Sequence, residues 1–119
     1  MKGTIISVPP NGPLKVVAEI NHAVDLETIK AAIGGGYIEL VPGFSSFEYQ
    51  GEHRQCLAFA DEDRKRKQLP LNEAATVMWH RAMRAQGGPG LIEPGGSIAD
   101  VLCGPVAVVF GDQTFMEKL

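Results

Sequence analysis

The chain has 119 residues and a formal net charge of −3, from 11 Lys and Arg against 14 Asp and Glu. This length fits one domain, and the acidic balance argues against a mainly electrostatic nucleic-acid or membrane-surface binder. Hydrophobic residues make up 45% and charged residues 21%, which excludes an intrinsically disordered chain. No apolar stretch approaches the ~18 residues of a membrane-spanning helix, and the short apolar run at the start lacks a signal-peptide cleavage site.

The first third of the chain predicts a strand hairpin followed by a short helix. Residues 4–8 are β-branched and apolar and stop at a pair of prolines, and residues 14–20 alternate as in a half-buried strand. The turn-rich segment between them favours antiparallel pairing. Asp25 then suits the N-cap of a helix over residues 26–33, and Gly34 suits its end.

Three further strand candidates fill the middle of the chain. They are residues 37–41, which end at a Pro-Gly pair, residues 44–49, and residues 55–60. A charged run over residues 61–67 follows and contains no apolar side chain. Such a run is typical of a turn that lies in solvent.

The last part of the chain contains the clearest helix and the clearest strand. Residues 74–84 favour a helix, and Asn72 suits its N-cap. Residues 105–110 are continuously apolar, which predicts a central strand buried on both faces. The Gly- and Pro-rich residues 86–97 predict a long loop, and residues 112–119 predict a loosely held tail. One face of this helix should point toward the core, and it carries the side chains of Ala75, Met78, Trp79 and Ala82.

Strands outnumber helices in this order of elements, and several adjoin through short turns. That arrangement favours the α+β class. We expect a single domain over residues 1–111, with a mainly antiparallel sheet of about five or six strands and two short helices on one face. Residues 112–119 would follow as a C-terminal tail.

The sequence offers few groups for catalysis. Cys56 and Cys103 are the candidate nucleophiles, and we interpret both as reduced, buried residues of a cytoplasmic protein. His53 stands three residues before Cys56, and this odd separation on a strand places the two side chains on opposite faces. No Cys-x-x-Cys pair and no pair of histidines at helical spacing is present. We therefore expect no catalytic residue, no metal and no cofactor.

An anion site is the sharper binding hypothesis. The start of the second helix, at Asn72, offers free backbone N–H groups at the positive end of the helix dipole. The charged run just before it supplies four cations, which are Arg64, Lys65, Arg66 and Lys67. Together these groups could hold a small anionic ligand or an acidic protein surface. The alternative interpretation is a capped helix beside a solvated turn.

Apolar residues outside the regular pattern support a second binding hypothesis. Phe44 and Phe47 fit the core face of their strand poorly, and Leu91 and Ile92 lie in the Gly/Pro-rich loop. Such residues can mark an interface with a partner protein, and packing into the core is the alternative. DNA mimicry is disfavoured, because a net charge of −3 is far too small to imitate a duplex with one charge every ~1.7 Å.

Three motifs, in this order and spacing, resemble a known family. They are Gly36-Tyr37-Ile38-Glu39-Leu40-Val41, Leu69-Pro70-Leu71-Asn72-Glu73-Ala74-Ala75-Thr76 and Gly104-Pro105-Val106-Ala107-Val108-Val109. Over roughly residues 2–111, the chain is similar to a domain-of-unknown-function family of small proteins encoded by phages, prophages and plasmids, with a Leu-Pro-x-Asn-x-x-Ala signature. The resemblance implies a small α+β fold and a mobile-element setting, and it supplies no catalytic residues.

We therefore expect a non-enzymatic accessory binding protein of phage type, which counteracts a host defence by sequestering an anionic nucleotide-derived ligand. The alternatives are an inhibitor that binds a host protein through an apolar loop surface, and a small cysteine-dependent hydrolase. The expected partners are a host protein or a small anionic ligand in the cytoplasm, without a membrane. Nucleic acid is disfavoured as a partner, and assembly into a homo-oligomer stays open.

Overall fold

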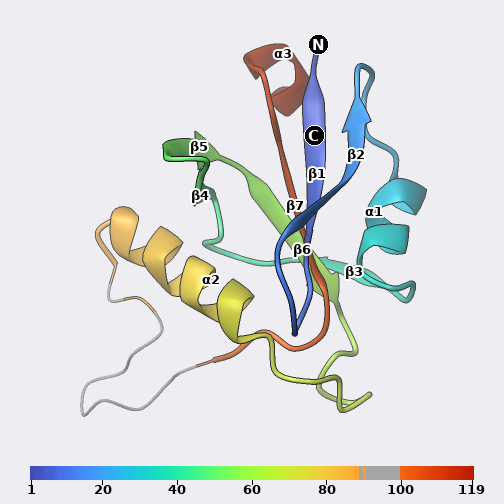
Figure 1. Ribbon diagram of the computed structural model, residues 1–119, viewed down its shortest axis with the longest axis vertical. Coiled ribbons are helices and arrows are strands. Elements are labelled where there is room, and N and C mark those ends of the chain that lie inside the picture. Colours follow the sequence, from blue (N-terminus) through green and yellow to red (C-terminus); the bar gives the residue numbers. More distant parts are fainter. Residues whose placement is uncertain (89, 91–99) are drawn as a thin grey trace.

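The computed structural model describes residues 1–88, 90 and 100–119, and this part of the chain forms seven strands and three helices (Figure 1). In chain order they are β1 (Gly3–Val8), β2 (Lys15–Ile20), α1 (Leu26–Ala32), β3 (Ile38–Leu40), β4 (Ser46–Tyr49), β5 (Glu52–Gln55), β6 (Leu57–Asp61), α2 (Glu73–Ala85), β7 (Val106–Gly111) and α3 (Gln113–Met116). Most of the long loop predicted over residues 86–97 lies outside the described residues.

Five strands form one antiparallel sheet in the order β2-β1-β7-β6-β3. β7 lies at its centre, with β1 on one side and β6 on the other. Residues 106–110 of β7 are all buried, which confirms the predicted central strand. A continuous apolar run is stable there because both faces of the sheet are covered.

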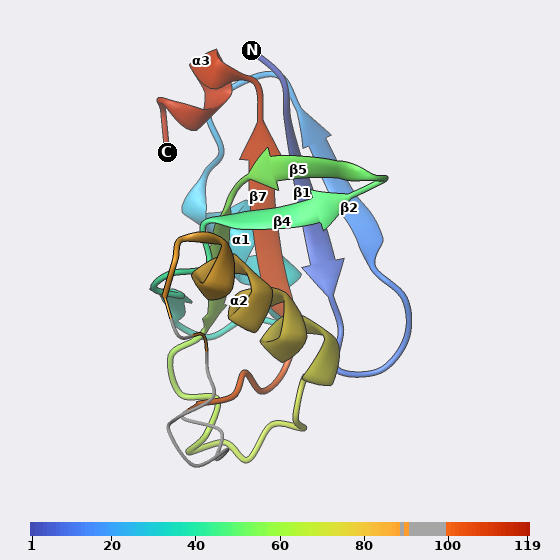
Figure 2. The same cartoon turned by 90° about the vertical axis from the view of Figure 1, so that its left-hand side faces the viewer.

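The covering elements lie on both faces of the sheet (Figures 1 and 2). Ile6 and Val108 face a core shared with α2 and the β4–β5 hairpin, whereas Ile5 and Val109 face a core shared with α1 and α3. The α+β class and the mainly antiparallel sheet are confirmed. The prediction of both helices on one face is wrong, because successive residues of a strand point to opposite faces and each apolar face needs a cover.

The two longer helices begin and pack as the sequence predicts. The side chain of Asp25 accepts a hydrogen bond from the backbone N–H of Thr28 at the start of α1. Ala75, Trp79 and Ala82 of α2 are buried against the sheet. These contacts follow from helical spacing, which places residues three and four apart on one face.

The β4–β5 hairpin is a second, two-stranded sheet that lies across the face of the first (Figure 2). Gln50 and Gly51 form its turn with positive φ angles of 53° and 78°. The sequence pattern predicts one strand over residues 55–60, whereas in the structure β5 ends at Gln55 and β6 covers Leu57–Asp61. The sequence does not predict β5, because residues 52–55 contain no apolar side chain.

The C-terminal segment is packed, so the prediction of a loosely held tail over residues 112–119 is wrong for its first half. Asp112 caps α3 by accepting a hydrogen bond from the backbone N–H of Phe115 at 2.9 Å. The ring of Phe115 is fully buried. It lies against Gly3 and Gly111, which face each other across β1 and β7, and a Cβ at either glycine would collide with it. Two facing glycines thus make the space for this ring.

Candidate functional site

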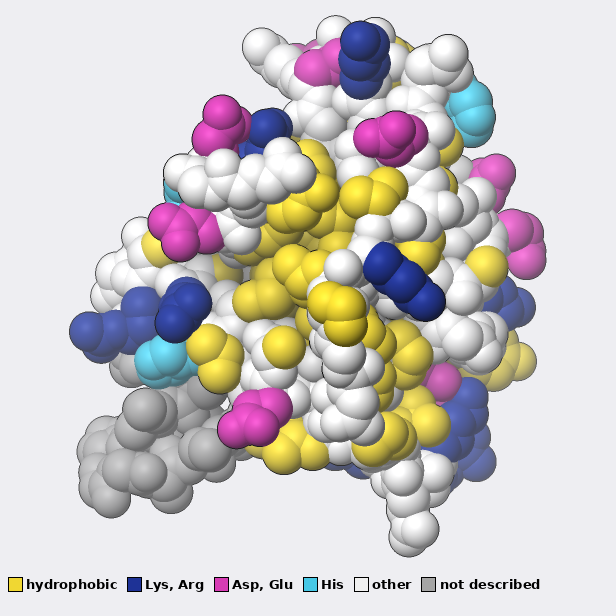
Figure 3. Space-filling model, in the orientation of Figure 1, with side chains coloured by type: hydrophobic (Ala, Val, Ile, Leu, Met, Phe, Trp, Pro, Cys, Tyr) yellow, Lys and Arg dark blue, Asp and Glu magenta, His cyan; other side chains and the backbone are white. Residues whose placement is uncertain are grey.

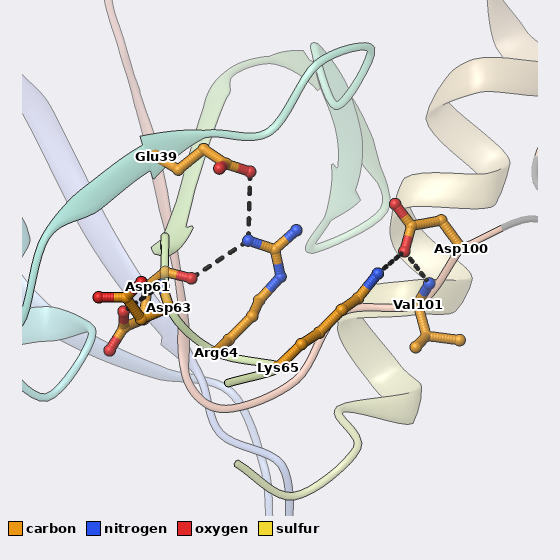
Figure 4. A network of polar contacts seen from close by, with 7 residues as sticks. All are labelled: Glu39, Asp61, Asp63, Arg64, Lys65, Asp100 and Val101. Carbon is orange, nitrogen blue, oxygen red and sulfur yellow. Dashed lines mark hydrogen bonds and ion pairs between the residues drawn. The ribbon is translucent and has the colours of Figure 1, made fainter. Parts of the chain in front are cut away.

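Each of the four cations of the predicted anion site pairs with a carboxylate of the chain itself. The pairs are Arg64–Glu39 at 3.2 Å, Lys65–Asp100 at 2.6 Å, Arg66–Asp63 at 2.8 Å and Lys67–Asp61 at 2.6 Å. Arg64 is only 7% exposed, and its Nη1 also donates to the backbone carbonyl oxygen of Asp61 at 3.1 Å (Figure 4). The prediction of a solvated turn is therefore wrong for Arg64 and Asp61, which are both buried. Ion pairs with Glu39 and Asp100 hold the charged run against other segments of the chain.

Asn72 lies in the interior, away from solvent. Its amide nitrogen donates to the carbonyl oxygens of Val8 and Gly104 at 2.8 and 2.9 Å, and its Oδ1 accepts the backbone N–H of Ala75 at 3.0 Å. The N-cap prediction is confirmed. The structure does not bring Asn72 to a surface beside the four cations, because its amide joins β1, α2 and the segment before β7.

Asp61 anchors the charged turn from inside the protein. Its carboxylate accepts hydrogen bonds from Lys67 Nζ at 2.6 Å and from the backbone N–H of Asp63 at 2.8 Å. Burial by itself raises the pKa of this carboxyl group. The two hydrogen bonds and the charges of Lys67 and Arg64 outweigh burial and hold the pKa below its ordinary value of 3.8.

This lowered pKa predicts a pH dependence of stability. The ionised carboxylate stabilises the folded state above pH 3.8, and the contribution is lost as the pH falls through the lower folded-state pKa. We expect Asp61→Asn to lower the urea midpoint at pH 7, and its difference from the wild type to shrink below pH 3.8. Glu62→Gln, at an exposed neighbour, should leave the midpoint unchanged at both pH values. A difference of constant size from pH 7 to pH 2.5 would contradict this role.

The structure buries the two phenylalanines of the apolar partner surface predicted from the sequence. Phe44 and Phe47 are 1% and 5% exposed and belong to the core under α2 and the hairpin. Leu91 and Ile92 lie outside the described residues. Other apolar side chains gather on the face where β2, α2 and the hairpin meet, with charged side chains of both signs around them (Figure 3).

Of the two cysteines predicted to be buried, Cys56 is buried and Cys103 is only partly buried, so that prediction is wrong for Cys103. Cys56 is buried and donates from Sγ to the carbonyl oxygen of Phe44 at 3.8 Å. Burial raises the pKa of its thiol to about 12, so the reactive thiolate is scarce at neutral pH. His53 is exposed on β5. Within residues 1–88, 90 and 100–119, no group of three or more His, Cys, Asp or Glu side chains is placed to hold a metal ion.

Two cavities flank a residue that the sequence analysis did not single out, Arg54 of β5. The larger has a volume of about 580 Å³ and lies between β5 and α3, with Gln55 and Gln113 in its wall. The smaller has a volume of about 390 Å³ and includes Lys2 and Tyr49. Arg54, Phe110 and Gly111 line both cavities. We call the two cavities together the Arg54 cleft.

The hairpin register places Arg54 between the two sheets. Phe47 pairs with Arg54 and Tyr49 pairs with Glu52 across the hairpin, so these four side chains share its inner face. Phe47 and Tyr49 form an aromatic cluster with Phe110 of β7, with ring centroids 5.3 to 5.8 Å apart. The guanidinium carbon of Arg54 lies 5.3 Å from the centroid of the Phe110 ring, within the range of a cation–π contact.

The hydrogen bonding of Arg54 is incomplete. Its Nη2 donates to Oε2 of Glu52 at 2.8 Å. Its Nε, like that of Arg64 in the charged turn, is buried and has no hydrogen-bond partner among the described residues, but of these two arginines only Arg54 lines one of the described cavities. Most buried polar groups in folded proteins are paired, and an unpaired one costs ~1–3 kcal/mol. Arg54 therefore contributes to the wall of both cavities a guanidinium group that packs on the ring of Phe110 and has one unpaired, buried donor.

Comparisons with protein-family models, curated proteins and solved structures find no match to this chain. The resemblance to the phage and plasmid family therefore stays a prediction. Among the described residues, every helix is too short or too polar to cross a membrane. The choice of a function consequently depends on the geometry of the Arg54 cleft.

Proposed function

We propose that the protein is a non-enzymatic binding module that holds a small anionic, nucleotide-derived ligand in the Arg54 cleft. The observation that carries this proposal is that Arg54 lines two cavities and that its buried Nε lacks a partner among the described residues. A guanidinium group binds phosphate or carboxylate through two parallel N–H donors. An anion in the cleft would supply the acceptor that Nε lacks.

The walls of the cleft support a ligand with an aromatic part as well as a charge. Phe110 and Met116 offer apolar surface in the larger cavity, and the amide of Gln55 can hydrogen-bond to the edge of a nucleobase. The other amide in this wall, that of Gln113, already donates from Nε2 to Glu117 at 3.1 Å. Lys2 adds a cation to the smaller cavity, and no carboxylate among the described residues pairs with its Nζ. The carboxylates of Glu19 and Asp112 also line the smaller cavity, and that of Glu117 lines the larger one. A phosphate would therefore lie against Arg54 and Lys2, away from these carboxylates, with its base toward Gln55.

The proposed mode of action is sequestration. Binding without turnover agrees with the inert thiol of Cys56. The resemblance to phage-, prophage- and plasmid-encoded proteins supports a setting in a host cytoplasm, where removal of a nucleotide signal would weaken a defence system.

Binding should depend on Arg54 and not on the charged turn. We expect at least one compound in a panel of cyclic and ADP-ribose-type nucleotides to raise the melting temperature of the wild type. Arg54→Gln should weaken that ligand about 10- to 100-fold in calorimetric titration, because a charge-assisted hydrogen-bonded contact is lost. Arg66→Gln removes the same charge from an arginine already paired with Asp63 and should leave the affinity unchanged.

Two results would contradict the proposal. The first is a complete panel without any shift in melting temperature. The second is loss of binding in Arg66→Gln together with full binding in Arg54→Gln, which would move the anion site back to the charged turn.

A further inference from the structure

The side-on edge of the Arg54 guanidinium is half occupied. This edge presents Nε–H and Nη2–H in parallel, the arrangement that binds two oxygens of one phosphate or carboxylate group. Glu52 takes only Nη2, through a single hydrogen bond of 2.8 Å, while Nε has no partner among the described residues. Glu52 therefore satisfies one of two donors that a better-shaped anion would satisfy together.

The pair between Glu52 and Arg54 is weakly held. The two residues stand two apart on β5 and lie on its inner face, with Glu52 beside the turn of the hairpin. The side chain of Glu52 is 68% exposed and that of Arg54 is 38% exposed. Water screens ion pairs with this exposure, and such pairs contribute little to stability. Displacement of the Glu52 carboxylate is consequently cheap for the protein.

We infer that Glu52 is an internal competitor that a ligand must displace, and that it selects for anions with two adjacent oxygens. Such an anion bridges Nε and Nη2 of Arg54, and Glu52 turns out into solvent. An anion that makes only one contact, such as chloride, replaces one hydrogen bond with another and gains nothing. This inference rests on the proposed function, and it names the terminal phosphate as the part of the ligand that Arg54 recognises.

Removal of the competitor should strengthen phosphate binding. We expect Glu52→Gln to bind adenosine 5′-monophosphate and inorganic phosphate about two- to fivefold more tightly than the wild type, the factor that corresponds to an exposed ion pair. Glu48→Gln is the matched control, because it removes one negative charge from the same hairpin at a residue that pairs with His53 on the outer face. It should change either affinity by much less. Added chloride should not change the ratio of the affinities that the two variants have for either probe.

The side-chain Nε–H resonance of Arg54 gives a direct readout in nuclear magnetic resonance spectra. It should shift when phosphate is added to the wild type and to Glu52→Gln. An equal increase in phosphate affinity in Glu52→Gln and Glu48→Gln would overturn the inference, since the loss of one negative charge from the hairpin would then explain both increases. Binding that requires Arg54 but is not strengthened in Glu52→Gln would overturn the inference and leave the proposed function intact. An Nε–H resonance that no probe shifts in either protein would overturn both.

Discussion

Replacement of Asn72 with alanine should lower the free energy of unfolding by about 3 kcal/mol. The side chain makes three hydrogen bonds in a site without solvent exposure. Alanine removes the cap of α2 and leaves the carbonyl oxygens of Val8 and Gly104 without their donor. Loss of a cap costs ~1 kcal/mol, and each buried group left without a partner adds ~1 kcal/mol or more. Urea denaturation followed by circular dichroism measures the change.

Asn21→Ala, at an exposed asparagine, is the control for Asn72→Ala and should stay within about 0.5 kcal/mol of the wild type. A loss below 1 kcal/mol in Asn72→Ala would mean that the amide does not join the three segments as described. Ligand binding by a folded Asn72→Ala protein should persist, because the Arg54 cleft does not include this residue.

Replacement of Phe115 with alanine should cost about 4 kcal/mol, the largest single effect that we expect. The ring is fully buried and fills the space between the facing glycines Gly3 and Gly111. Its removal leaves a cavity that glycine backbones cannot fill, because the strands on either side are fixed in the sheet. Thermal and urea unfolding of the purified variant measure the loss. Leu119→Ala, at a partly exposed side chain, should have little effect.

A second substitution isolates the contact between Gly3 and the ring. Gly3→Ala should destabilise the wild type, because its Cβ collides with the ring of Phe115. In the Phe115→Ala background the same change should cost much less, since the colliding ring is absent. Equal costs in both backgrounds would show that Gly3 is required for its backbone and not for the space that it leaves.

Local patterns in the sequence predicted the elements that carry one dominant signal. The apolar run of residues 105–110 gave the central strand, and helical spacing gave the buried stripe of Ala75, Trp79 and Ala82. The face that each helix covers could not be predicted in this way. A strand buried on both sides has no polar face, so its hydrophobic pattern does not indicate which helix covers which face of the sheet.

The site depends on contacts between distant residues, and this explains why its prediction failed in detail. Glu39 is 25 residues before Arg64, and Asp100 is 35 residues after Lys65, so a list of cations could not show that they are paired. Arg54 gains its surroundings from the hairpin register and from Phe110 of another sheet. The alternation of Glu52 and Arg54 after a Gln-Gly turn was the only local signal.

The position of β7 has a consequence for how the chain is made in the cell. Among the described residues β7 follows the other six strands in sequence, yet it is the strand that connects the β1–β2 pair with the β6–β3 pair. While a ribosome is still adding residues before 106, no strand joins the two half-sheets, and the inner edges of β1 and β6 are unpaired. Folding can finish only after this late segment leaves the exit tunnel. Slow translation before that point would lengthen the interval in which chaperones are needed to prevent aggregation.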